Sequence, residues 1–155
     1  MDDTATARVV HALVATRMDY CNALCYDLPA KVIGKLQRAQ NAAARLVTKT
    51  KKFDHITPHL KALHWLPARQ RIAFKVLIMV YKAVHKDAPR YICELVTEKP
   101  SIRSLRSGGQ RLLVEPPSRL RSYGDRAFKN SGPRLWNKLP LYIREADTLV
   151  VLKNT

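Results

Sequence analysis

Residues 68–85 read ARQRIAFKVLIMVYKAVH and contain the longest uninterrupted apolar run of the chain. At about 100° per residue, the apolar side chains of this segment cover most of the circumference of a helix. They are Ile72, Phe74, Val76, Leu77, Ile78, Val80, Tyr81 and Val84. Arg69, Arg71 and Lys75 gather in the N-terminal half, so that end should reach the surface. The pattern predicts a central buried helix.

Residues 30–48, AKVIGKLQRAQNAAARLVT, show the clearest helical period of the chain, and Pro29 suits the start of a helix. One side of this helix would carry an apolar seam, formed by Ile33, Leu36, Ala43 and Val47. The opposite side would carry a basic stripe, formed by Lys31, Lys35, Arg38, Arg45 and Lys49. We expect the helix at 68–85 to pack on the apolar seam at the centre of the fold. Taken alone, the stripe fits either a solvated outer face or a polyanion-binding surface.

Shorter helices are predicted around these two. Residues 4–26 favour one helix or a broken pair of helices, and residues 90–96 favour a short helix. Residues 57–66 should form another, with Thr57 as the N-cap and Pro58 just inside it.

The composition changes beyond residue 98, where Gly, Pro and Ser punctuate a segment rich in arginine. Loops should dominate there, with a short strand at 112–115, a helix at 125–137 and the first turns of a helix from residue 149. The predicted fold class is mainly α, an irregular helical bundle with a loop-rich C-terminal part. We expect a helical core region at 1–98 and, at 99–155, an Arg-rich loop with a truncated C-terminal helical segment.

The charge balance predicts a polyanionic partner. Twenty-eight Lys and Arg against twelve Asp and Glu give a formal net charge of +16. Residues 1–28 contribute −2, residues 29–100 contribute +11 and residues 101–155 contribute +7, so the partner surface should lie in the last two segments. Nucleic acid is the commonest partner for such a charge, because each neutralised phosphate releases condensed counterions. An acidic membrane surface is the alternative, although no apolar stretch approaches the ~18 residues that span a bilayer.

Cysteine usage and the N-terminus indicate an intracellular protein, nuclear or cytoplasmic. Cys21, Cys25 and Cys93 are an odd number at spacings that suggest no disulfide framework, which fits a reducing compartment. No basic-then-apolar leader opens the chain.

Catalytic, cofactor and metal motifs are not evident. Met1-Asp2-Asp3 resembles the end of a polymerase Asp-Asp hairpin, but it lacks the strand before it and the third acidic residue of a two-metal site. Cys21-x3-Cys25 and His55-x3-His59 are too far apart for a compact zinc finger, and buried thiols with surface histidines are the expectation. Trp65 and Trp136 could stack on bases, but their apolar neighbours favour a packing role.

A second basic surface is predicted in the loop-rich segment. Its arginines are Arg103, Arg106, Arg111, Arg119 and Arg121. Guanidinium groups match phosphate geometry, so this segment could follow a nucleic-acid backbone, although a solvated loop is the alternative. Lys51 and Lys52 would extend the first surface, the stripe on residues 30–48.

Motifs along nearly the whole chain resemble a known family. They are RMDYCN (17–22), KLQRAQNAAARLV (35–47), FDHITP (53–58), LHWLP (63–67), RIAFK (71–75), YKA (81–83), SLRS (104–107), YGDRAF (123–128) and PRLWNKLP (133–140). In this order they resemble the region C-terminal to the polymerase domain in LINE-type (non-LTR, jockey-like) retrotransposon reverse transcriptases. The endonuclease and polymerase motifs of that family lie upstream of the matching region.

The resemblance implies a non-catalytic segment that follows the thumb and helps to hold template RNA or target DNA. The expected partner is therefore RNA or DNA, bound with little regard to sequence and without a cofactor. An alternative is a structural or interaction module that contacts the polymerase domain of the parent protein. A relic without present function is a third.

Overall fold

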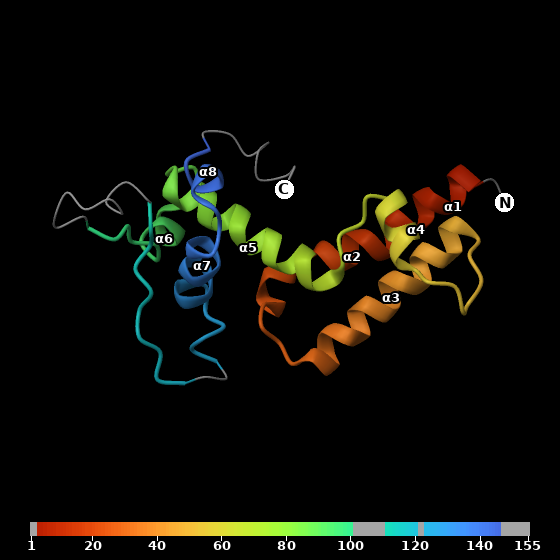
Figure 1. Ribbon diagram of the computed structural model, residues 1–155, viewed down its shortest axis with the longest axis horizontal. Helices are drawn as coiled ribbons and strands as arrows, with labels where there is room; N and C mark the ends of the chain where they lie inside the picture. The colour runs from red at the N-terminus through yellow and green to blue at the C-terminus, as the bar shows by residue number, and fades with distance from the viewer. Residues whose placement is uncertain (1–2, 101–110, 121–122, 147–155) are drawn as a thin grey trace. The chain divides into compact units, whose positions relative to one another are not determined.

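The computed structural model describes residues 3–100, 111–120 and 123–146 (Figure 1). These residues form helices joined by loops, which confirms the mainly α fold class. The strand predicted at 112–115 is wrong, since the described residues hold only an isolated antiparallel bridge between Glu98 and Leu113. A longer ladder cannot follow this bridge, because Pro116 and Pro117 lack the N–H groups that it would need. The helix predicted from residue 149 lies outside the described residues.

The chain divides into two compact units, Met1–Phe74 and Lys75–Thr155. The boundary lies inside the helix α5 (Ala68–Val84). Hydrophobic periodicity predicts where a helix lies, but it does not predict which parts of the chain pack against each half of that helix.

The first unit opens with a helical segment that changes its hydrogen-bonding pattern twice. It consists of α1 (Asp3–Val10), a π-helix (His11–Ala15) and α2 (Thr16–Asp19). The hydroxyl of Thr16 donates to the carbonyl of Ala12, a bond that is common where a helix departs from regular α geometry. Cys21 then adopts a left-handed conformation (φ 51°) before a 3-10 turn at Asn22–Cys25. The predicted broken pair of helices is thus a helix with a π segment followed by a short turn.

Helix α3 (Ala30–Thr48) has the bounds that the sequence predicts. The carbonyl of Pro29 accepts hydrogen bonds from the N–H groups of Val32 and Ile33 at 2.9 and 3.3 Å. Lys49 ends the helix in a left-handed conformation, and its N–H bonds the carbonyl of Arg45. Helix α3 packs against α1 and the π-helix (Figure 1).

The first turns of α5 pack on the apolar seam of α3, as predicted. Ile33, Ala68 and Ile72 are buried together, and Leu36 is packed against them. This confirms the expected packing of the two helices for the part of α5 that belongs to the first unit. Ala43 of the seam and the adjacent Ala44 are also buried.

Helix α4 (Thr57–Ala62) begins at the predicted residue and ends four residues before the predicted Leu66. The N-cap position is Ile56, whose carbonyl accepts a hydrogen bond from Leu60, so Thr57 as N-cap is wrong. A proline needs no N–H partner anywhere in the first turn, so Pro58 fits one position further inside the helix.

Two glutamines of α3 hold the chain on both sides of Pro67. Nε2 of Gln40 donates to the carbonyl of Leu66 at 2.8 Å, and Oε1 of Gln37 accepts the N–H of Ala68 at 2.8 Å. The Ala68 N–H lies at the start of α5, where a helix has no carbonyl of its own to bond. Gln40 is 1% exposed, so this polar pair fixes the start of α5 from within the core.

The second unit contains the later turns of α5, α6 (Arg90–Cys93), α7 (Phe128–Asn137) and α8 (Leu141–Arg144). Trp136 is fully buried, and its indole N–H donates to the carbonyl of Arg111 at 2.9 Å. The side-chain amide of Asn137 bonds both the N–H and the carbonyl of Leu113, at 2.9 and 3.0 Å. The packing role predicted for Trp136 is confirmed. Within the described ranges, no helix is both long and apolar enough to cross a membrane.

Candidate nucleic-acid interface

Helix α3 places three cations of the predicted stripe in solvent. Lys31, Lys35 and Arg38 are exposed, whereas Arg45 is half-buried. At 1.5 Å per residue, the stripe from Lys31 to Arg45 extends over ~21 Å along the helix. That length corresponds to roughly six nucleotides of a stacked strand at 3.4 Å per phosphate.

The charge on α3 is of one sign. The helix holds Lys31, Lys35, Arg38 and Arg45 and no Asp or Glu. Among the described residues, no ion pair or hydrogen bond involves the side chains of Lys31, Lys35 or Arg38. Solvated helix faces usually alternate charges at i,i+4 spacing, because such pairs stabilise the helix. Here Lys31 and Lys35 are a like-charged pair at that spacing, which destabilises it.

The position of Lys31 adds to this cost. It lies in the first turn of α3, where the helix macrodipole is positive and no acidic residue offsets it. Lys31 and Lys35 therefore do not stabilise the helix that carries them, whereas Arg45 lies in the last turn, where the macrodipole favours a cation.

The loop after α3 carries two further cations and is held against the helix. Lys51 and Lys52 are exposed. Nη2 of Arg45 donates to the main-chain carbonyl of Asp54 at 3.3 Å, which ties the loop to the last turn of α3. Arg45 thus has a structural contact as well as a charge, unlike the fully exposed members of the stripe.

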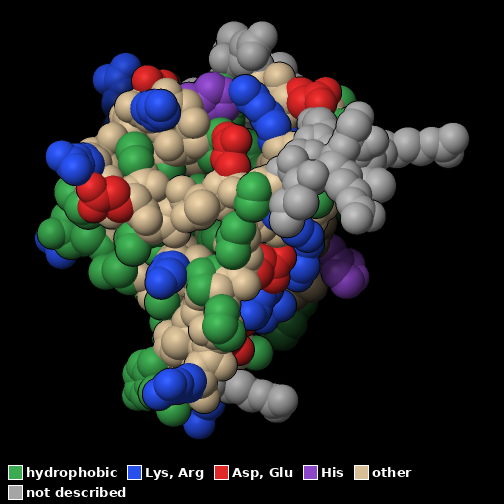
Figure 2. Space-filling view, turned by 90° about the vertical axis from the view of Figure 1, so that its left-hand side faces the viewer, with side chains coloured by type: hydrophobic (Ala, Val, Ile, Leu, Met, Phe, Trp, Pro, Cys, Tyr) green, Lys and Arg blue, Asp and Glu red, His purple; other side chains and the backbone are tan. Residues whose placement is uncertain are grey.

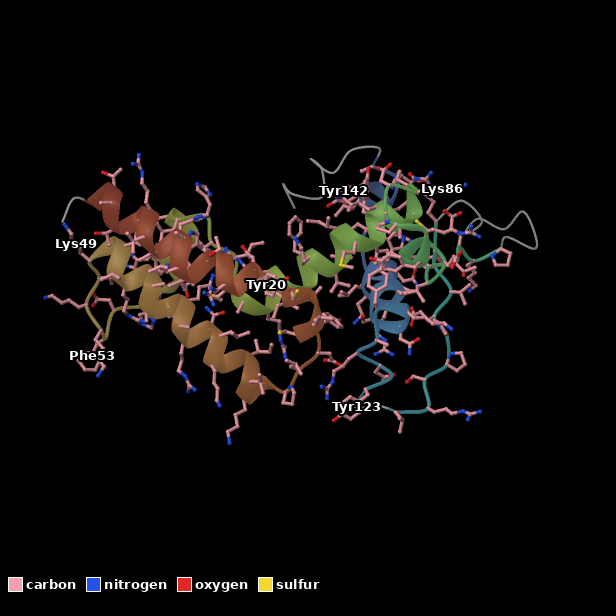
Figure 3. The ribbon with its side chains drawn as sticks, turned by 180° about the vertical axis from the view of Figure 1, so that it is seen from behind. Tyr20, Lys49, Phe53, Lys86, Tyr123 and Tyr142 are labelled. Carbon is pink, nitrogen blue, oxygen red and sulfur yellow. The ribbon has the colours of Figure 1, made fainter. Side chains whose placement is uncertain are left out.

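Phe53 lies in this loop. The sequence did not predict it as a binding residue, although it is the first residue of the FDHITP motif. Its side chain is 92% exposed, and Nζ of Lys52 lies 5.8 Å from the centre of its ring. Figure 3 shows Phe53 and Lys49 at the same end of the first unit, with Phe53 on the loop. An aromatic residue inside the run KTKKF is the signal that could have identified it.

The second predicted surface is described only in part. Arg111 and Arg119 are exposed residues of the second unit, and the carbonyl of Arg111 accepts the indole N–H of Trp136. Arg103, Arg106 and Arg121 lie outside the described residues. On the face seen in Figure 2, Lys and Arg side chains occupy separate positions with acidic and apolar side chains between them. The candidate interface is therefore built on the first unit, from α3 and the loop that follows it.

The cysteines and histidines are not arranged as a metal site. No group of three His, Cys, Asp or Glu side chains within residues 3–100, 111–120 and 123–146 comes together as metal ligands. Cys21 is exposed and Cys25 half-buried, so the expectation of two buried thiols is wrong for Cys21. Its left-handed backbone between two helical segments turns the side chain out of the apolar face.

Comparison with known proteins identifies no relative of this chain. No family model matches it, and neither does any curated protein or solved structure. The resemblance to LINE-type retrotransposon proteins remains a prediction from the sequence motifs, and the function must be argued from the geometry of the chain itself.

Proposed function

We propose that this chain is a non-catalytic nucleic-acid-binding segment that holds RNA or DNA through α3 and the loop that follows it. One observation carries the proposal. The exposed face of α3 presents Lys31, Lys35 and Arg38 with no acidic residue on the helix, and Lys51 and Lys52 continue that charge. Their ammonium and guanidinium groups would contact phosphates and release condensed counterions, which supplies affinity without reading a sequence.

We further propose that the segment derives from the C-terminal, post-polymerase region of a LINE-type reverse transcriptase. The motif KLQRAQNAAARLV coincides with most of α3, so one motif supplies Lys35, Arg38 and Arg45 of the stripe and also the two glutamines that hold the start of α5. In this view the chemistry of DNA synthesis belongs to the parent's upstream domains. This segment would steady the template or the target while that chemistry proceeds.

The test is a fluorescence-anisotropy titration of the full chain with a structured RNA and a matched DNA duplex at two salt concentrations. A stripe variant carries Lys31→Glu, Lys35→Glu and Arg38→Glu. A control variant carries Lys82→Glu, Lys129→Glu and Lys138→Glu, three exposed lysines of the second unit. Both variants lower the formal net charge from +16 to +10, so they separate the effect of the surface from that of total charge.

The wild type should bind both ligands, with log K falling as log salt rises. The stripe variant should lose binding, and the slope should fall by about 0.7 to 0.9 for each phosphate contact removed. The control variant should stay close to the wild type. Equal losses in both variants would mean that charge acts without a defined surface, and a folded wild type that binds neither ligand would disprove the proposal.

A protein-interaction module is the second candidate, because the N-terminal helical segment exposes apolar and aromatic side chains. Leu13, Tyr20 and Leu24 are 67%, 80% and 81% exposed. Such residues would suit contact with a polymerase domain. The stripe variant separates the two candidates, since it should abolish RNA binding but leave a contact made through these residues intact.

A further inference from the structure

The loop between α3 and α4 is built as a turn with Lys52 and Phe53 at its tip. The N–H of Asp54 donates to the carbonyl of Lys51 at 3.3 Å, which closes the turn. The Asp54 carboxylate accepts the N–H of Lys51, also at 3.3 Å. With both ends of the turn bonded to each other, the two central residues point away from the bonds that close it.

The base of this turn is anchored to both flanking helices. On the α3 side, Arg45 bonds the carbonyl of Asp54, and the N–H of Thr50 bonds the carbonyl of Arg45 at 3.2 Å. The Thr50 hydroxyl also lies 2.6 Å from the hydroxyl of Thr48 in α3, and on the α4 side it lies 3.2 Å from Nδ1 of His59. The tip is thus presented from a bonded base, so a ligand would meet a surface that needs little ordering.

The exposure of Phe53 needs an explanation that the fold does not supply. A turn tip in water is ordinarily polar, and a phenylalanine left there forgoes the stabilisation that burial of its ring would bring. The exposed tyrosines Tyr20, Tyr91, Tyr123 and Tyr142 each carry a hydroxyl that solvent can bond. Phe53 has none, yet at 92% it is more exposed than any of them.

The surroundings of Phe53 define the kind of ligand that would cover the ring. A flat apolar face with the ammonium group of Lys52 beside it, and with Lys51 as a second exposed cation of the same turn, matches a molecule that combines a planar ring with a negative charge. The Nζ of Lys52 lies 5.8 Å from the ring centre, close enough for a cation–π contact. A nucleotide has both parts, a base to lie on the ring and a phosphate to meet a lysine.

We propose that Phe53 is a stacking platform for an unpaired base of single-stranded nucleic acid, with Lys51 and Lys52 on the neighbouring phosphates. This inference rests on the proposed function and narrows its ligand. In a duplex, both faces of each internal base are covered by adjacent pairs, so a side chain at a turn tip can reach only edges and backbone. The stripe on α3 accepts phosphates of either form, whereas Phe53 favours a strand with open base faces.

The experiment uses the full chain and a single-stranded oligonucleotide with one 2-aminopurine, beside a duplex of the same sequence. The variants are Phe53→Ala, Phe53→Leu and Phe53→Tyr, and Tyr20→Ala serves as a matched control, since Tyr20 is an exposed aromatic of the same unit. Phe53→Leu keeps an apolar side chain and removes the aromatic face, while Phe53→Tyr keeps that face. Because Phe53 is almost fully exposed, none of its variants should shift the thermal midpoint.

Wild type and Phe53→Tyr should quench 2-aminopurine and bind the single strand equally well. Phe53→Ala and Phe53→Leu should lose the quenching and weaken single-strand binding about 5-fold to 100-fold, the range expected for one stacked base. Duplex affinity and the salt slope should not change, because no phosphate contact is removed. Tyr20→Ala should behave as the wild type.

Two failures are distinguishable. If the wild type binds the single strand but Phe53→Ala and Phe53→Leu bind and quench as it does, the stacking platform is disproved and the basic surface stands. If the folded wild type binds neither single strand nor duplex at low salt, the proposed function fails and the platform fails with it.

Discussion

Gly34 and Gly132 are both glycines inside helices, but a side chain would meet different surroundings at each. A Cβ added to Gly34 in α3 would have no heavy atom within 4 Å. A Cβ added to Gly132 in α7 would lie 2.8 Å from Cγ2 of Val80 in α5, which is closer than real Cβ contacts. Glycine is thus required where α7 approaches α5 and is not required in α3.

The paired substitutions test this difference. Gly34→Ala should raise the free energy of unfolding by ~0.5–1 kcal/mol, since alanine restricts the unfolded chain and favours the helix. Gly132→Ala should lower it by ~1–3 kcal/mol, because the new methyl group overpacks the contact with Val80. Urea denaturation followed by circular dichroism measures both.

A double substitution locates the cause. Val80→Ala removes the methyl group that the new Cβ would meet, so Gly132→Ala should cost less in that background than in the wild type. If Gly132→Ala lowers the free energy of unfolding equally in the wild type and in Val80→Ala, the contact between position 132 and Val80 is not the cause of the loss.

At the scale of the element, Lys31 and Lys35 lie at positions in α3 where a positive charge lowers the stability of the helix. Lys31 lies at the end of α3 where the macrodipole favours anions, and it faces Lys35 at i,i+4 spacing. A helix selected for stability alone would place an acidic residue in that turn. The cation is consistent with a role in binding that offsets the cost.

Lys31→Glu should therefore move stability and binding in opposite directions. The free energy of unfolding should rise by ~0.3–1 kcal/mol at low ionic strength, because the new anion complements the macrodipole. Affinity for RNA should fall, since one phosphate contact is lost. Thermal melts and anisotropy titrations on the same sample measure the two effects.

Lys82→Glu is the matched control, since Lys82 is an exposed lysine in the last turn of α5, where the macrodipole favours a cation. It should lower stability slightly and leave RNA affinity unchanged. Lower stability in Lys31→Glu, or equal loss of affinity in the two variants, would contradict the account of α3.

For the whole molecule, a net charge of +16 on 155 residues means that the folded chain repels itself. Added salt screens this repulsion, since the Debye length falls from about 30 Å at 0.01 M to about 10 Å at 0.1 M ionic strength. The thermal midpoint should rise over that interval of sodium chloride. The same interval should weaken nucleic-acid binding.

Calorimetry measures the thermal midpoint in sodium chloride and, as a control, in an equimolar uncharged osmolyte. The control separates charge screening from general solute effects. A midpoint that does not change, or that falls, as sodium chloride increases would mean that ion pairs outweigh repulsion. Arg71–Asp19, Arg90–Glu94 and Arg134–Asp125 are such pairs among the described residues, and none of these three is fully buried.

The sequence by itself determined the helices at 30–48 and 68–84 and the residues that share the basic side of the first. Both helices are long and periodic, each follows a proline, and their faces depend only on spacing along the chain. The contact between the apolar seam and the start of α5 followed from the same pattern. The burial of Trp136 also followed from the sequence, because leucine and proline residues lie near it in the motif PRLWNKLP.

Only the tertiary structure decided which residues far apart in sequence meet. The π segment, the bridge that replaces the strand at 112–115, the glutamines beside Pro67 and the unit boundary inside α5 all depend on such neighbours. The exposure of Phe53 belongs with them, because an aromatic residue between polar ones can be buried or presented to solvent. Local periodicity carries no information on that choice, which is made by the hydrogen bonds that anchor the turn to α3 and α4.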